Sequence, residues 1–157
     1  PPLNGTRFDA ALAVALEKGD VVSMDGVLSH ATAGAAAHAR AQERADAAFA
    51  LLEGTLTPPF ADGVASSLNC TKSEAYAALG DLEEQGHAVK IDRDLYYDAA
   101  VFNKLVEAVR AHIEAKGPSL ATDLKDAMGV SRKYAIPVLE ALDDRGITKR
   151  DGDLRTL

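Results

Sequence analysis

A repeat with a period of 60 residues constrains the fold of this chain more than any other feature of its sequence. Residues 68–90, LNCTKSEAYAALGDLEEQGHAVK, align with residues 128–150, MGVSRKYAIPVLEALDDRGITKR. In both segments apolar residues recur at three- and four-residue spacing, which predicts one buried face of a helix. Thr71 and Ser131 stand where the two helices begin, so their hydroxyl groups are expected to cap a free helix N–H.

The segments that follow the repeated helix are also alike. Gly86 and Gly146 stand at the helix ends, where a left-handed residue is favoured. Two short strand-like runs around an Asp-rich turn come next, in residues 87–97 and again in residues 147–157. Each repeat therefore predicts a helix followed by a two-stranded hairpin.

Further helical segments precede each repeated helix. Short ones are expected at 61–68 and 121–128, and longer ones at about 39–52 and 100–116. The order helix, short helix, turn, helix, hairpin is that of a helix-turn-helix with a wing. The sequence therefore predicts a mainly α fold with small β-hairpin wings (α+β), arranged as tandem winged-helix domains.

A weaker third copy opens the chain. Residues 8–30 contain a helical pattern, a stop at Gly19 and two short strands around Asp25-Gly26. The alanine-rich residues 31–39 either link flexibly or extend the next helix, since Ala is a strong helix former. We expect three domains: the C-terminal part of an upstream winged helix (1–33), a winged-helix spacer (34–99) and a terminal winged helix (100–157).

Composition argues against several classes of protein. No apolar run approaches the roughly 18 residues of a membrane span, and no signal peptide is present. The single Cys70 cannot form an internal disulfide, which fits a reducing cytosol. No histidine pairs with another ligand at metal spacing, and no phosphate loop or catalytic triad is found. We therefore expect no metal and no catalysis, and the start at Pro1 suggests a fragment.

The charge is unevenly placed along the chain. Residues 119–157 carry seven basic and seven acidic side chains, so the whole net charge of −7 lies in residues 1–118. An acidic chain is a poor nonspecific binder of nucleic acid, because the background repels phosphates. Any nucleic-acid site must therefore be local.

The first turn of the last repeated helix is the strongest candidate for such a site. It reads Ser131-Arg132-Lys133-Tyr134, where the middle repeat has Thr-Lys-Ser-Glu. Cations are mildly unfavourable at a helix N-terminus, but together with free N–H groups they favour a bound phosphate. Tyr134 could stack on an unpaired base. The alternative is a solvated helix end with Tyr134 packed as a core aromatic residue.

The predicted wing adds basic candidates, and alternation places Thr148 and Arg150 on one strand face, opposite Lys149. Wings often contact nucleic acid, but Arg150 or Arg155 could equally pair with Asp151 or Asp153.

Two neighbouring features are interpreted as structural. Pro137 is expected to kink the helix or make its first turn irregular, and Asp143-Asp144 is interpreted as a solvated face.

The last 27 residues resemble the C-terminal end of the SelB family, the bacterial selenocysteine-specific translation elongation factors. The family pattern there is similar to Ser-Arg-Lys-Tyr-Ala-x-Pro-x-Leu-Glu, then Gly-x-Thr-x-Arg, then Gly-Asp-x-Arg-x-Leu. The matching positions are residues 131–140, Gly146, Thr148, Arg150, Gly152, Asp153, Arg155 and Leu157. Family members often have Arg where this chain has Lys125, which keeps the charge without bidentate geometry.

The resemblance implies that the terminal winged helix recognises an mRNA hairpin, the selenocysteine insertion element, and so directs selenocysteine incorporation at UGA codons. GTP and Mg²⁺ would bind an N-terminal GTPase part absent from this chain. Ribosome and selenocysteyl-tRNA would be partners of the full-length factor, in the cytoplasm, and no membrane is implied. The candidate RNA-binding residues are Ser131, Arg132, Lys133, Tyr134, Thr148, Lys149, Arg150 and Arg155.

Two other functions remain open. Winged helices most often bind double-stranded DNA as transcription regulators, which usually needs a dimer. No dimerisation helix stands out here, so we expect a monomer. Some winged helices instead form protein-interaction arrays without a nucleic-acid role.

Overall fold

The structure, a computed structural model, describes residues 13–14, 21–24 and 27–157. The chain divides into two compact units, residues 1–43 and 44–157. In the first unit, strands β1 (Val21–Met24) and β2 (Val27–His30) pair antiparallel, with Val21 opposite His30. The two strands predicted around Asp25-Gly26 are therefore confirmed. The helix predicted ahead of them, with its stop at Gly19, lies outside the described residues except for 13–14.

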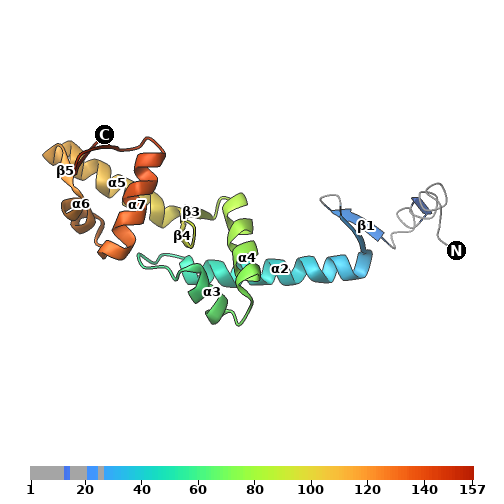
Figure 1. The fold of residues 1–157 in the computed structure, drawn as a ribbon. Helices are drawn as coiled ribbons and strands as arrows, with labels where there is room; N and C mark the ends of the chain where they lie inside the picture. The colour runs from blue at the N-terminus through green and yellow to red at the C-terminus, as the bar shows by residue number, and fades with distance from the viewer. Residues whose placement is uncertain (1–12, 15–20, 25–26) are drawn as a thin grey trace. The chain divides into compact units, whose positions relative to one another are not determined.

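The next elements have the order predicted for a winged helix (Figure 1). They are helices α2 (Ala31–Leu52), α3 (Ala61–Ser67) and α4 (Lys72–Glu84), and strands β3 (Ala88–Asp92) and β4 (Leu95–Asp98). Helix α2 begins at Ala31, not near Ala39, so the alanine-rich segment extends the helix and is not a loop linker. Its later turns pack with α3, α4 and the hairpin around small residues and leucines, among them Ala48, Leu52, Leu79 and Leu82.

The terminal repeat folds in the same order. It comprises helices α5 (Ala99–Lys116), α6 (Ala121–Met128) and α7 (Arg132–Asp144), and strands β5 (Ser119–Leu120), β6 (Lys149–Asp151) and β7 (Leu154–Thr156). Strand β7 lies between β5 and β6 and is antiparallel to both, with Arg155 opposite Ser119 on one side and Arg150 on the other. Strand β5 was not predicted, because two residues are too few to show a periodic pattern.

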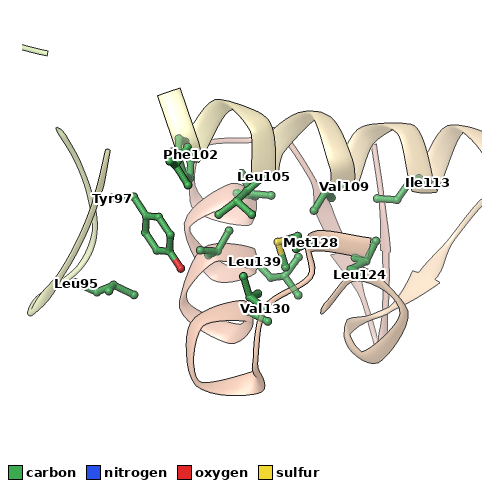
Figure 2. Packing of buried hydrophobic residues seen from close by; sticks show 14 residues of the cluster. Leu95, Tyr97, Phe102, Leu105, Val109, Ile113, Leu124, Met128, Val130 and Leu139 are labelled. Carbon is green, nitrogen blue, oxygen red and sulfur yellow. The ribbon is translucent and has the colours of Figure 1, made fainter. Parts of the chain in front are cut away.

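One hydrophobic cluster joins the two winged helices. Leu105 and Val109 of α5, Leu124 of α6 and Leu139 of α7 are fully or almost fully buried together. Two residues of the middle hairpin, Leu95 and Tyr97, belong to the same cluster, and Figure 2 shows Tyr97 pointing toward α7. The middle wing therefore completes the hydrophobic core of the terminal domain, and the chain from Arg44, within α2, to Leu157 forms one compact unit.

Helix α7 starts and ends at the predicted residues. Ser131 is its N-cap residue, and Gly146 follows it with φ of 66°, the left-handed conformation that glycine adopts without a steric cost. The helix is continuous through Pro137, and of the two effects expected there, a kink or an irregular first turn, the second is observed. Its first turn is tightened, because the N–H groups of Tyr134 and Ala135 both donate to the Ser131 carbonyl, at 3.0 and 2.9 Å.

The described helices include none that is long and apolar enough to cross a membrane.

Candidate nucleic-acid interface

The first turn of α7 presents two cations to solvent. The side chains of Ser131, Arg132 and Lys133 are exposed, and Tyr134 is half-buried. Within the described part of the chain, neither Arg132 nor Lys133 forms an ion pair with a carboxylate. The basic turn predicted from the sequence is therefore present at the surface with both charges unneutralised.

The N-terminus of α7 is not capped by a side chain. Ser131 occupies the N-cap position, but its hydroxyl group makes no cap hydrogen bond, so that part of the prediction is wrong. In the middle repeat, Thr71 accepts from the Glu74 N–H, and Glu74 in turn accepts from the Thr71 N–H. Tyr134 stands where the middle repeat has Glu74 and cannot complete such a capping box. The end of α7 therefore keeps N–H groups that an anion could satisfy.

A pocket of about 470 Å³ opens beside this helix end. It lies between α6 and α7 and is lined by Ala121, Thr122, Lys125, Ser131, Arg132, Ala135 and Ile136. The ammonium group of Lys125 pairs with Asp126, its exposed neighbour on α6. A lining that combines apolar side chains with hydroxyl and cationic groups suits an unpaired base together with its phosphate.

The wing carries two further exposed cations. Lys149 and Arg150 are both exposed on β6, and neither forms an ion pair among the described residues. The guanidinium Nε of Arg150 donates to the Gly152 carbonyl at 3.0 Å, across the turn of the hairpin. The alternative pairing of Arg150 with Asp151 or Asp153 is therefore not found in this structure.

Thr148 and Arg155 were also predicted to bind RNA, but they are only 3% and 4% exposed. The Thr148 hydroxyl donates to Oδ1 of Asp143 at 2.5 Å, and Nε of Arg155 donates to Oδ2 of the same carboxylate at 2.9 Å. Both side chains are therefore buried in this structure, and their direct contact with RNA stays a prediction. The interpretation of Asp143 as solvated is wrong, because its carboxylate joins α7 to the wing.

Tyr134 packs against the middle winged helix. Its ring centroid lies 5.7 Å from that of Phe60, and the ammonium group of Lys133 lies 4.3 Å from the Phe60 centroid. The interpretation of Tyr134 as a packed aromatic residue is therefore favoured over its availability to stack on an unpaired base. Nothing in the sequence pattern pointed to Phe60 as part of this surface, because the contact joins two repeats.

The matching surface of the middle winged helix is neutralised. Lys72 pairs with Asp62 at 2.6 Å, and Arg44 pairs with Glu74 at 2.8 Å. The Thr71 backbone N–H, the Thr71 hydroxyl and Arg44 together hold the pKa of Glu74 below its ordinary value. One scaffold therefore carries a neutral face in the middle repeat and a basic face in the terminal repeat.

The fold and this surface define a tandem winged-helix protein with one basic face on its terminal domain. Residues 111–157 match the family model described as elongation factor SelB, winged helix. The C-terminal part of the chain is therefore similar to the winged helix of SelB.

Two curated proteins of the same kind are also similar to this chain. The selenocysteine-specific elongation factor of Desulfomicrobium baculatum is 29% identical over 106 residues, which are 68% of this chain and 17% of that protein. The corresponding Escherichia coli (strain K12) factor is 33% identical over 75 residues, 48% of this chain and 12% of that protein. The chain thus spans less than a fifth of the length of these relatives.

Two solved structures are similar to this chain in their fold. One is the mRNA-binding domain of E. coli elongation factor SelB in complex with SECIS RNA, at a TM-score of 0.68 and 26% identity, over 74% of this chain and 95% of that one. The other is a bacterial selenocysteine-specific elongation factor, EF-Sec, at a TM-score of 0.59 and 17% identity, over 96% of this chain and 24% of that one. The second shows the fold alone.

Proposed function

We propose that this chain is the RNA-binding C-terminal part of a selenocysteine-specific elongation factor, and that its terminal winged helix binds the selenocysteine insertion hairpin of an mRNA. One observation carries the proposal: the uncapped first turn of α7 presents Arg132 and Lys133 beside a pocket, on a fold shared with a SelB domain solved with SECIS RNA. The aligned turn of the middle domain lacks these features.

The geometry suits a hairpin better than a regular duplex. The deep, narrow major groove of an RNA helix excludes a protein helix, so proteins read its backbone and the unpaired bases of loops and bulges. Arg132, Lys133 and the free N–H groups of α7 would hold phosphates. The pocket between α6 and α7 would receive an unpaired base, and Lys149 and Arg150 would follow the backbone from the wing.

The acidic remainder of the chain is consistent with a local contact. The arm would bring the hairpin reader to the ribosome without binding bulk RNA, since the ion pairs of the middle domain leave no free cation on its matching turn. The full-length factor would carry selenocysteyl-tRNA in the cytoplasm and hydrolyse GTP with Mg²⁺ in an N-terminal part. Catalysis would therefore lie outside this chain, which would act as a monomer.

Binding should be measured by fluorescence anisotropy with three labelled probes of matched length. These are an RNA hairpin with unpaired loop and bulge bases, a fully paired RNA helix and a DNA duplex. We expect the hairpin to bind most tightly, with an affinity that falls as salt rises. Equal or tighter binding of the DNA duplex would favour a transcription regulator, and no binding of any probe would favour a protein-interaction module. Either result would overturn the proposal.

A further inference from the structure

Helix α7 contacts the middle winged helix at both of its ends. At the N-terminal end, Lys133 and Tyr134 lie against Phe60, which stands immediately before α3. At the C-terminal end, Nη2 of Arg145 donates to the Lys90 carbonyl of β3 at 2.8 Å. The helix that carries the candidate RNA contacts is therefore held by a domain that carries none of them.

Phe60 is placed by a rigid segment. It follows Thr57, Pro58 and Pro59, and Pro58 is fully buried. The N–H of Ala61 donates to the Asp94 carbonyl at 2.8 Å, which fixes the residue after Phe60.

The start of the same segment is fixed as well. The Tyr97 hydroxyl donates to the Leu56 carbonyl at 2.9 Å. Burial raises the pKa of Tyr97, so the hydroxyl stays protonated as a donor. Hydrogen bonds thus anchor both ends of residues 56–61, and the Phe60 ring is a fixed surface in contact with α7.

Lys133 lies against two rings. Its ammonium group is 4.3 Å from the centroid of Phe60 and 5.6 Å from that of Tyr134, within the range of cation–π attraction. An aromatic face attracts the ammonium group but leaves its charge uncancelled, whereas the carboxylate of Asp62 neutralises Lys72 in the middle repeat. Lys133 therefore has a preferred position and still has its full charge for a phosphate.

We propose that Phe60 is a positioning residue for RNA binding: its ring, supplied by the middle winged helix, holds the Lys133 ammonium group where a phosphate of the hairpin will lie. The proposal rests on the proposed function of the terminal domain. The contact between Phe60 and Lys133 would lower the entropic cost of binding, because a long side chain that is already ordered loses less rotamer freedom when RNA binds. The middle domain thus contributes to affinity without touching the RNA.

A double-mutant cycle in the whole 157-residue chain tests this. Phe60→Leu removes the aromatic face and Lys133→Met removes the charge, each alone and combined, with hairpin affinity measured by anisotropy at several salt concentrations. We expect Phe60→Leu to weaken binding about two- to tenfold, the effect of having to order one long side chain when RNA binds. It should leave the salt dependence unchanged, whereas Lys133→Met should reduce it. In the Lys133→Met background, Phe60→Leu should have no further effect.

The chain offers a matched control and a conservative variant. Phe49 is also a half-buried phenylalanine, but its ring packs on His87 within the middle domain. Phe49→Leu should therefore leave hairpin affinity unchanged, and Phe60→Tyr should keep wild-type affinity because it keeps the ring. Thermal unfolding of each variant checks that it is folded.

The position of Lys133 also has a readout without RNA. A ring at 4.3 Å shifts the NMR signals of the Lys133 side-chain methylene protons upfield, and Phe60→Leu should remove most of this shift, leaving the smaller effect of Tyr134, while Phe49→Leu retains it. If the wild-type chain fails to bind the hairpin, the proposed function fails. If the wild type binds but Phe60→Leu weakens binding equally with and without Lys133, or not at all, the positioning role alone is overturned. Absence of the upfield shift would overturn it regardless of RNA binding.

Discussion

Arg155 on strand β7 donates its Nε hydrogen to Oδ2 of Asp143 near the end of α7, at 2.9 Å. The Arg155 side chain is 4% exposed and that of Asp143 is 19% exposed, so the pair is largely removed from water. The other carboxylate oxygen of Asp143 accepts from Thr148 at 2.5 Å. This carboxylate therefore fixes the wing relative to the helix from which the candidate RNA contacts project.

Removal of this carboxylate should destabilise the terminal domain. Asp143→Ala leaves the Arg155 guanidinium buried without its partner, and loss of one member of a buried pair is costly. We expect the free energy of unfolding to fall by about 2–3 kcal/mol. This loss is smaller than that expected for a fully buried pair, because Asp143 is partly exposed. Urea unfolding measures this loss. The adjacent exposed Asp144→Ala is the control and should change stability by less than about 0.5 kcal/mol; equal effects of the two substitutions would contradict this account of the wing.

The exposed and the buried basic residues of the wing should behave differently. Lys149→Ala combined with Arg150→Ala should weaken hairpin binding and reduce the slope of log affinity against log salt by about 1–2, because up to two phosphate contacts are lost. Stability should stay near that of wild type. Arg155→Ala should instead lower the free energy of unfolding. The molecules of this variant that remain folded should bind the hairpin with the wild-type slope of log affinity against log salt. A reduced slope for Arg155→Ala would mean that Arg155 contacts the RNA directly.

The N-cap residues of α4 and α7 are expected to respond differently to the same substitution. Thr71→Ala removes a hydroxyl that caps α4 and should cost about 1 kcal/mol of stability. Ser131→Ala removes a hydroxyl that makes no cap bond, so stability should change little. Chemical denaturation of both variants, each against wild type, makes the comparison. Similar losses for the two would show that Ser131 caps α7 in solution.

Glu74 should make stability depend on pH. Its pKa is lowered in the folded state, first by the hydrogen bond from the Thr71 backbone and then by the Thr71 hydroxyl. A lowered folded-state pKa means that the ionised form stabilises the fold. The contribution is therefore present above the ordinary pKa of 4.5 and is lost as pH falls through the lower, folded-state value.

Glu74→Gln isolates this contribution. The difference in unfolding free energy between wild type and Glu74→Gln should be largest near pH 7 and should shrink as pH falls below about 4.5. Denaturation series from pH 7 to pH 3 provide the measurement. A difference that stays constant over this range would show that the charge of Glu74 does not support the capping box.

The scaffold could be predicted from the sequence because the pattern of each main helix and hairpin occurs in both repeats. The N-cap positions, the left-handed Gly86 and Gly146, and the two hairpins of the unit of residues 44–157 all follow from local rules. Strand β5 was missed because two residues carry no periodicity, and its pairing with β7 is set by the fold.

The candidate site was predictable only in part. The exposed cations Arg132 and Lys133 followed from comparison of the two repeats. The burial of Arg155 did not, because its partner Asp143 lies on the preceding helix and alternation along a strand gives no information on such partners. The contact between Phe60 and Lys133 joins different domains, and no spacing rule within one element reports it.

The central claim is that the first turn of α7 binds the hairpin through its charges, and Arg132→Ala combined with Lys133→Ala tests it most directly. We expect hairpin affinity to fall by about tenfold or more, with a clearly reduced salt slope. Stability should change little, because removal of unfavourable cations from a helix N-terminus is offset by loss of the contact between Lys133 and Phe60. Lys72→Ala, at the aligned position of the middle domain, should leave affinity unchanged. A folded double variant that binds the hairpin with wild-type affinity and salt slope would contradict the account.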